Sequence, residues 1–494
     1  MIGWDAAEDH GAAHRHLVPI LVFIGMVASL VSSLGAPLLP TIAKVDHVSL
    51  DEAQWSLTVA VLVGAVASPI MGRLGDGRHR RRVILASLAV VAGGGVMAGL
   101  PGGFGLLVGG RALQGVGLGL MPLTMAVARD HLPEARSRPA IAILSIAVAA
   151  GVGLGYPVTG LFDEYLGLHS AFWFGAGVAV VALVVSLPTL PASPATTRRA
   201  LDLPGAVLLA GALTCFLVDL SEGQIWGWGS SASVGLLVAA LIIGVVWVGW
   251  ERRAPFPLVR LELLRHRVVR GANFAAFLIA AAMYMFLPLL TDFVQTPRRA
   301  GYGFGASVVL AGLMLLPFSV LSVSMSRVAA WFGVRFGERW VIPLGATVLG
   351  GAVLYFDRTG QHLWQGFVAM AFAGVGVGFT FAAMPGLIVR SVPPEETGSA
   401  LGFYQVVRYI GFAGGSALSA SLLAAYTPAG HALPDRTGYV TAMAVGSILC
   451  LLTAGLSLMW GRRSGVVPPA ALSLLTGGAE AGGAPKPPTL ADLT

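Results

Sequence analysis

The sequence predicts an all-α protein that crosses a membrane many times, and three observations support this fold class. First, 56% of the 494 residues are hydrophobic and 11% are charged, whereas about 25% of the residues of soluble domains are charged. Second, apolar runs of about 20 residues, enough to cross a ~30 Å hydrocarbon core as a helix, recur along nearly the whole chain. Third, arginines gather in alternate loops between these runs. Helices satisfy their own backbone polar groups within such runs, so we expect helical spans.

The distribution of basic charge indicates a membrane surface rather than a polyanionic partner. The net charge of +7 would suggest nucleic acid in a soluble protein, but these arginines stand in short loops. There they set the topology and contact anionic lipid headgroups. We therefore expect a lipid bilayer, and no nucleic acid, among the partners. The two cysteines, Cys215 and Cys450, lie within apolar runs, so neither a disulfide framework nor a metal site is expected.

Fourteen membrane-spanning helices are predicted from the apolar runs. The first is expected to be retained, because Leu17–Ala43 is too long for a signal-peptide core. The predicted helices are 17–41, 53–72, 83–100, 104–128, 138–162, 169–190, 203–221, 233–250, 270–293, 304–326, 338–356, 362–388, 397–424 and 438–461. An even count and the arginine-rich loops place both termini in the cytoplasm of a multi-pass plasma-membrane protein. The basic residues on outer loops are Lys44, Arg298, Arg299, Arg358 and Arg436.

The chain is expected to divide into two six-helix halves with an extra helix pair between them. Residues 17–190 form the first half, 201–250 the pair and 270–461 the second half, with a cytoplasmic tail at 1–16 and a disordered one at 462–494. A central pair leaves the two halves topologically equivalent, as parallel repeats about an axis along the membrane normal require.

A crowded basic loop, Gly72–Arg82, separates the second and third predicted helices and reads GRLGDGRHRRR. Such a loop can be a simple topology anchor. Its single acid, Asp76, favours a second role, because a carboxylate is stabilised at the positive N-terminus of a helix. The helix starting near Thr397 is the best candidate, since threonine is a good N-cap. In the second half, Ser326–Arg335 occupies the matching place, with Ala330 where the acid would repeat.

Two arginines are predicted inside membrane helices, where a charge is expensive unless it faces a cavity or a partner. Arg111 is followed by Gln114 one turn later, and it either faces a cavity or caps backbone carbonyls of a neighbouring helix. Arg408 shares a helix face with Tyr404 and Gln405, because residues three and four apart meet on a helix. This face lines a site or forms a hydrogen-bond network between helices.

No predicted helix carries an acid at its centre, and the acidic residues cluster at outer ends. If protons are coupled, Asp292 and Asp163 are therefore the first candidates. Two positive side chains in one cavity would repel a cation. We expect a neutral, zwitterionic or anionic substrate rather than a lipophilic cation.

These motifs resemble those of the major facilitator superfamily. The loop pattern matches at Gly72, Leu74, Asp76, Arg80 and Arg81, with His79 in place of a glycine, and Arg111-x-x-Gln114-Gly115 matches a second family motif. Gly151 to Gly160, with Tyr156 and Pro157, is similar to the antiporter motif, although Tyr156 replaces a glycine. Leu201–Gly205 and Ser221–Trp228 resemble the extra pair of the 14-helix drug:proton antiporter branch. The resemblance implies a conformational latch made by Gly72, Asp76, Arg80, Arg81 and Thr397.

The leading functional prediction is a secondary transporter that alternates access between its halves and exports a drug or metabolite against protons. No Gly-x-x-x-x-Gly-Lys-Ser/Thr loop occurs, so ATP hydrolysis is not expected. The histidines are scattered, which disfavours an enzyme, and no catalytic residue, metal or cofactor beyond a proton gradient is expected. A monomer is expected. A lipid exporter, a nutrient importer or uniporter, and a non-transporting receptor remain alternatives.

Overall fold

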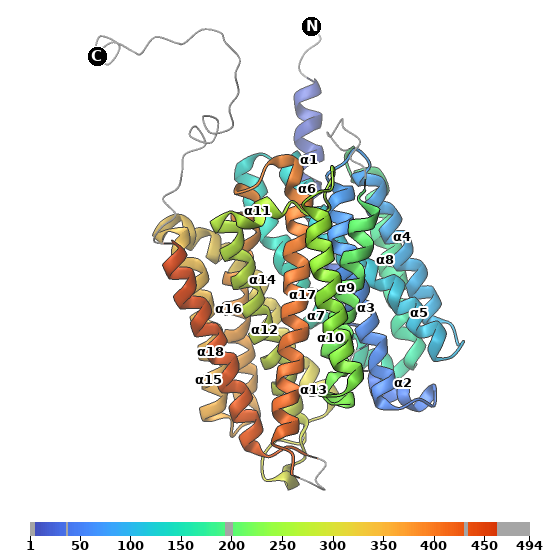
Figure 1. Ribbon diagram of the computed structural model, residues 1–494, viewed down its shortest axis with the longest axis vertical. Coiled ribbons are helices and arrows are strands. Elements are labelled where there is room, and N and C mark those ends of the chain that lie inside the picture. Colours follow the sequence, from blue (N-terminus) through green and yellow to red (C-terminus); the bar gives the residue numbers. More distant parts are fainter. Residues whose placement is uncertain (1–4, 36–37, 193–200, 429–432, 462–494) are drawn as a thin grey trace.

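The computed structural model describes residues 5–35, 38–192, 201–428 and 433–461. These residues form helices and connecting turns without any strand. Most of the long helices run side by side along one direction (Figure 1). This is the arrangement that apolar segments adopt when each must satisfy its own backbone.

The N-terminal half comprises the helices α1 to α8. Their bounds are α1 (Asp5–Ser33), α2 (Leu39–Val45), α3 (Leu50–Gly75), α4 (Arg80–Gly99), α5 (Phe104–Gly115), η2 (Val116–Gly119), α6 (Leu120–His131), α7 (Glu134–Leu166) and α8 (Leu168–Thr189). Ser49 and Glu52 form a capping box that starts α3, each satisfying a backbone N–H of the other residue. Gly167, at φ 83°, makes the sharp turn between α7 and α8.

The central pair follows as α9 (Leu203–Trp226) and α10 (Ser231–Glu251), then the short α11 (Leu261–Arg265). Asp202 and Ser230 cap the two long helices by accepting hydrogen bonds from Gly205 and Ser233 backbone N–H groups. Helix α9 packs against α3 and α17, whereas α10 contacts mainly α9 and leaves an apolar face exposed. The pair thus lies beside the bundle and bridges its two halves (Figure 1).

The C-terminal half comprises the helices α12 to α18. Their bounds are α12 (Arg267–Gln295), η3 (Arg298–Ala300), α13 (Val308–Leu313), α14 (Leu315–Phe336), η4 (Glu338–Trp340), α15 (Val341–Thr359), α16 (Leu363–Arg390), η5 (Pro394–Glu396), α17 (Thr397–Ala425) and α18 (Arg436–Gly461). The first described residues of α1 and the last of α18 lie at the same end of the bundle (Figure 1).

Twelve helical segments of the described residues are long and apolar enough to cross a membrane. Each of them corresponds to one of the predicted spans. The remaining two predicted spans fall on α1 and α7, which are 29 and 33 residues long. The predicted tail at 462–494 lies outside the described residues, as do 1–4.

Several predicted boundaries are wrong. Helix α1 spans Asp5–Ser33 rather than 17–41, and Leu39–Val45 forms a separate short helix, α2. Acids in the first turn of α1 favour its early start through the helix dipole. The stretch Ser326–Arg335 is not a loop but the last part of α14. It contains neither an acid nor a proline, and its glycine, Gly333, is helical, so the helix continues to Gly337, where φ is 101°.

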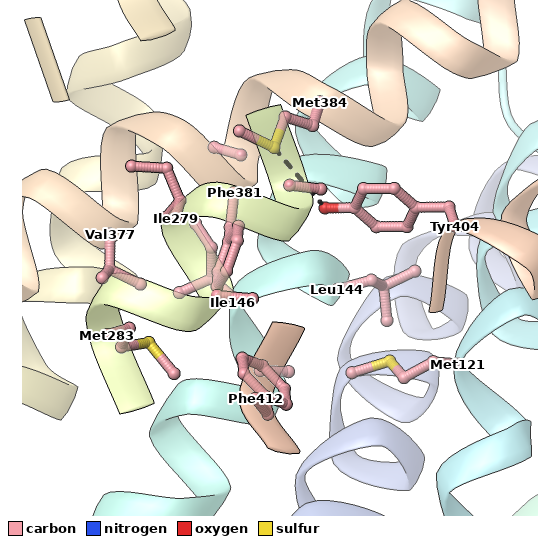
Figure 2. Packing of buried hydrophobic residues seen from close by; sticks show 14 of the residues in the cluster. Met121, Leu144, Ile146, Ile279, Met283, Val377, Phe381, Met384, Tyr404 and Phe412 are labelled. Atoms are coloured by element: carbon pink, nitrogen blue, oxygen red, sulfur yellow. Dashed lines mark hydrogen bonds between the residues drawn. The ribbon is translucent and has the colours of Figure 1, made fainter. Parts of the chain in front are cut away.

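The hydrophobic core runs without interruption across both halves. Figure 2 shows Met121 and Leu144 from the N-terminal half facing Tyr404 and Phe412 from α17. The core includes several methionines, whose flexible side chains fill irregular gaps between the helices. The halves therefore meet through an apolar, adaptable interface at mid-bundle.

Candidate functional site

One end of the bundle is closed by a contact between α3 and α17. The Asp76 carboxylate accepts hydrogen bonds from the backbone N–H of Gly398, at 2.7 Å, and of Ser399, at 3.0 Å. Asp76 is 4% exposed although it stands in a loop. Its two oxygens thus satisfy N–H groups that have no partner within α17, and they place negative charge at the positive end of that helix.

The predicted N-cap role of Thr397 is wrong. Thr397 is the first residue of α17, the N-cap position belongs to Glu396, and no side chain of that segment caps the helix. The Thr397 hydroxyl instead donates to the carbonyl of Pro394, at 2.9 Å. Because Asp76 supplies the missing acceptor, the cap of α17 comes from the other half of the molecule.

Glycines allow this close approach of α3 and α17. A Cβ atom built on Gly72 would lie 2.3 Å from the Gly398 carbonyl oxygen, and one on Gly398 would lie 2.4 Å from the Gly72 oxygen. One turn further on, a Cβ on Gly402 would lie 2.7 Å from the Ser68 oxygen. Small residues let helix backbones approach closely. Gly72 is therefore needed at this contact because a side chain there would collide with the backbone of α17.

Arginines brace the turn that carries Asp76. Arg80 donates through Nε to the Gly75 carbonyl and through Nη1 to Asp130 Oδ2, at 2.6 Å. Arg81 donates to the carbonyl of Leu187 at the end of α8. Both contacts lie within the N-terminal half, so these arginines hold the loop in place rather than bridging the halves.

Glu396, Arg73 and Arg260 extend the contact, and the sequence did not point to them. The Glu396 carboxylate pairs with Arg73 from α3 at 3.1 Å and with Arg260 from the segment after the central pair at 3.2 Å. The Ser399 hydroxyl donates to the carbonyl of Leu258 in the same segment, at 2.7 Å. The segment that follows the extra pair is thus bonded to the first turn of α17. No sequence signal links residues more than 130 positions apart.

Burial sets the protonation of Asp76. Desolvation raises the pKa of this carboxyl from 3.8 to about 7, against the opposing effect of the two N–H donors. The neighbouring charge of Glu396 raises the pKa further, and Arg80 lowers it. An acid whose pKa is higher when docked than when exposed binds protons more tightly in the docked state.

We therefore expect the contact between α3 and α17 to strengthen as pH falls. The stabilisation of the docked state by proton binding to Asp76 is complete below about pH 4 and is lost as pH rises through about 7. Distances between spin labels at Arg78 and Glu395 in the full chain would measure the docked population against pH. The Asp76→Asn variant should lose this dependence, and a dependence unchanged in that variant would assign the titration to another group.

Arg111 is held by main-chain carbonyls. Its Nε donates to the Ser56 carbonyl at 3.0 Å, and Nη1 donates to the Val31 carbonyl at 2.8 Å and to Gln114 Oε1 at 2.7 Å. The side chain is fully buried. It joins α5 to α1 and α3 within one half, which matches the alternative in which it caps carbonyls of neighbouring helices.

Of the two predicted proton carriers, the structure describes the side chain of Asp292 but not that of Asp163. Asp292 lies near the end of α12 and is exposed. The side chains of Tyr156, Pro157 and Asp163 in α7 lie outside the described residues. Among the residues that the structure describes, no three His, Cys, Asp or Glu side chains form a group that could hold a metal ion.

Arg408, Gln405 and Tyr404 meet at mid-bundle, as their spacing on α17 predicts. Arg408 Nη1 donates to Gln405 Oε1 at 2.8 Å, and all three side chains are buried. The guanidinium carbon lies 4.1 Å from the ring centre of Phe381 on α16 and 5.5 Å from that of Phe412. The chain therefore places one buried cation among aromatic rings at the level where the two halves face each other.

The fold and these sites define a polytopic helical membrane protein built from two interlocked halves. The family comparison makes this class specific. The model of the Major Facilitator Superfamily matches residues 21–416 and 272–481, and the chain belongs to this family of transporters.

Curated relatives include exporters of antibiotics and drugs. The Tetracenomycin C resistance and export protein of Streptomyces glaucescens is 28% identical over 424 residues, which cover 85% of this chain and 77% of the relative. The Multidrug resistance protein Stp of Mycobacterium tuberculosis is 29% identical over 400 residues, covering 79% and 72%. The probable actinorhodin transporter of Streptomyces coelicolor is 29% identical over 390 residues, covering 76% and 66%.

Solved structures share the fold at low sequence identity. The human organic anion transporter MFSD10 (TETRAN) superposes with a TM-score of 0.63 at 17% identity, covering 90% of this chain and 99% of that one. A mutant form of the peptide transporter POT gives a TM-score of 0.61 at 17% identity, covering 90% and 95%. At this identity the likeness supports the fold and not the substrate.

Proposed function

We propose that this protein is a secondary active exporter that works by alternating access and is driven by a proton gradient. The observation that carries the proposal is the docking of Asp76, from the N-terminal half, on the first turn of α17 in the C-terminal half. The two hydrogen bonds of Asp76, with the Glu396–Arg73 ion pair beside them, hold this end closed, and each such bond is weak enough to break during a cycle. The name of the Tetracenomycin C resistance and export protein supports the direction of transport.

The proposed cycle uses the two sites in different ways. With Asp76 docked, the end of the bundle at which α1 begins and α18 ends is closed (Figure 1). Undocking lets the halves rock apart at that end and exposes the mid-bundle interface around Arg408. The substrate is a small neutral or anionic molecule, because the positive charge of Arg408 repels cations. Protons are carried by Asp292, by Asp163 or by an ionisable group of the substrate, and the working unit is a monomer without a cofactor.

Proteoliposomes with an imposed pH gradient test this function. Of the neutral, anionic and cationic compounds tested, only the neutral or anionic ones are expected to be taken up. Their uptake should depend on the gradient and be slowed in Asp292→Asn or Asp163→Asn. Transport unaffected by the gradient would indicate a uniporter, and transport of lipid alone would indicate a lipid exporter. Binding without flux would indicate a receptor and would contradict the proposal.

We further propose that α1 and α7 span the membrane with the twelve segments already described, which makes fourteen spans with both termini in the cytoplasm of the plasma membrane. Cysteines placed at Gly102 and Ser230 should react with an impermeant reagent added outside intact cells. A cysteine at Ser464 should react only after the cells are opened. External labelling at Ser464 would show that the span count is odd.

A further inference from the structure

Among the residues that the structure describes, no carboxylate pairs with the positive charge of Arg408. Arg408 is 2% exposed, and none of the ion pairs formed by the described residues includes it. Nη1 reaches Gln405, but Nε has no hydrogen-bond acceptor among these residues. An unpaired buried charge is strongly destabilising. An acidic ligand would therefore gain from this side chain much more than it would at the protein surface.

Aromatic rings surround the guanidinium of Arg408 on several sides. The ring centres of Phe381, Phe412 and Tyr404 lie 4.1, 5.5 and 5.6 Å from its central carbon. Tyr284 stacks on Phe412, with ring centres 4.2 Å apart and planes inclined by 25°. Rings at these distances attract a cation, but they offset only part of the cost of its burial. They also form flat apolar walls on which another planar ring can stack.

Hydroxyl groups also lie buried near the interface. Ser145 on α7 lies beside Tyr404. The Tyr409 hydroxyl, on α17, lies beside Ser68 and Gln405. A hydroxyl can donate a hydrogen bond as well as accept one. When the halves separate, a ligand with oxygen acceptors can therefore bond to these hydroxyls in addition to Arg408 Nε.

The opposite wall of the interface is apolar and comes from the other half. Figure 2 shows Leu144, Ile146 and Met121 facing the side that carries Phe381, Phe412 and Tyr404. Methionine and leucine side chains adapt to rings of different outline. The interface thus combines the Arg408 guanidinium and aromatic rings from the C-terminal half with flexible apolar side chains from the N-terminal half.

We propose that this arrangement is a binding site for a planar aromatic acid. The acid group, a carboxylate or an ionised phenol, pairs with the Arg408 guanidinium, and the ring system stacks among Phe381, Phe412 and Tyr404 when the halves separate. The proposal rests on the proposed function and narrows its substrate class. It is independent of the pH gradient, because it concerns binding to the purified protein.

Three ligands on one scaffold test the site: anthraquinone-2-carboxylate, the corresponding carboxamide and 2-(aminomethyl)anthraquinone. Their affinities for the purified full chain in detergent are measured by microscale thermophoresis. Wild type should bind the carboxylate about tenfold or more tighter than the amide and the amine. Arg408→Gln should lose this preference. Arg408→Lys, which retains a positive charge, should keep part of it. The exposed Arg335→Gln control should keep all of it.

A second variant protects the test against misfolding of Arg408→Gln. Phe381→Leu retains the charge and loses one stacking wall, so it should weaken all three ligands severalfold while preserving the order carboxylate before amide. Failure of wild type to bind the carboxylate, or equal binding of the three ligands, would overturn the proposal. Equal competition by chloride would indicate a site for small inorganic anions and overturn it too. If the site proposal failed in this way but other compounds were still transported along the pH gradient, the proposed function would remain supported.

Discussion

Asp76→Asn is expected to slow transport by about tenfold or more while the protein still folds and inserts. The amide keeps the size of the carboxyl group but has one acceptor oxygen, so the N–H of Gly398 or Ser399 faces an NH₂ group. A buried donor left without an acceptor costs about 1–3 kcal/mol, which shifts the balance between docked and undocked states by roughly 5- to 150-fold. The protein would then spend most of its cycle undocked at this end.

Initial rates in proteoliposomes, with ligand affinity measured on the same preparation, check this expectation. Affinity should change little, because Asp76 is at the end of α3 and contacts Gly398, which precedes Arg408 by ten residues along α17. Glu262→Gln on α11 is the matched control, since it removes an exposed acid near the same end of the bundle. Wild-type rates in Asp76→Asn would mean that the loop only anchors the topology.

Gly72→Ala is expected to open the same contact by steric means. Its new Cβ would lie 2.3 Å from the carbonyl oxygen of Gly398, and this backbone atom can move only if α3 and α17 separate. Overpacking of this kind costs about 1–3 kcal/mol. The substitution acts on the docked state alone, so the docked population should fall by roughly tenfold or more and transport should slow accordingly.

Spin-label distances between Arg78 and Glu395 would report the docked population directly. Gly93→Ala is the matched control: this helical glycine of α4 has nothing within 4 Å of the position of a new Cβ. It should leave the distances and the rates unchanged. If Gly72→Ala kept the short distance, the helices would tolerate a methyl group here and glycine would not be required for docking.

The amino-acid sequence by itself determined the membrane character, the spans and the position of the Asp76 loop. These depend on local properties: the length of an apolar run, the arginines that flank it and the helical period that places Tyr404, Gln405 and Arg408 on one face. It also indicated the helix starting near Thr397 as the best docking partner for Asp76. The prediction of a loop at Ser326–Arg335 was wrong, because Gly333 is accommodated within the helix, which continues to Phe336.

Only the tertiary structure decided which groups these residues meet. Periodicity orients a side chain relative to its own helix, but the rotation and approach of helices depend on packing between segments hundreds of residues apart. Arg111 thus donates to the carbonyls of Val31 and Ser56. Glu396 pairs with Arg73 and Arg260. Arg408 lies among aromatic rings and pairs with no acid of the described residues. The tertiary structure also replaced Thr397 by Asp76 as the cap of α17, because backbone N–H groups at a helix end bond to whichever acceptor the fold brings to them.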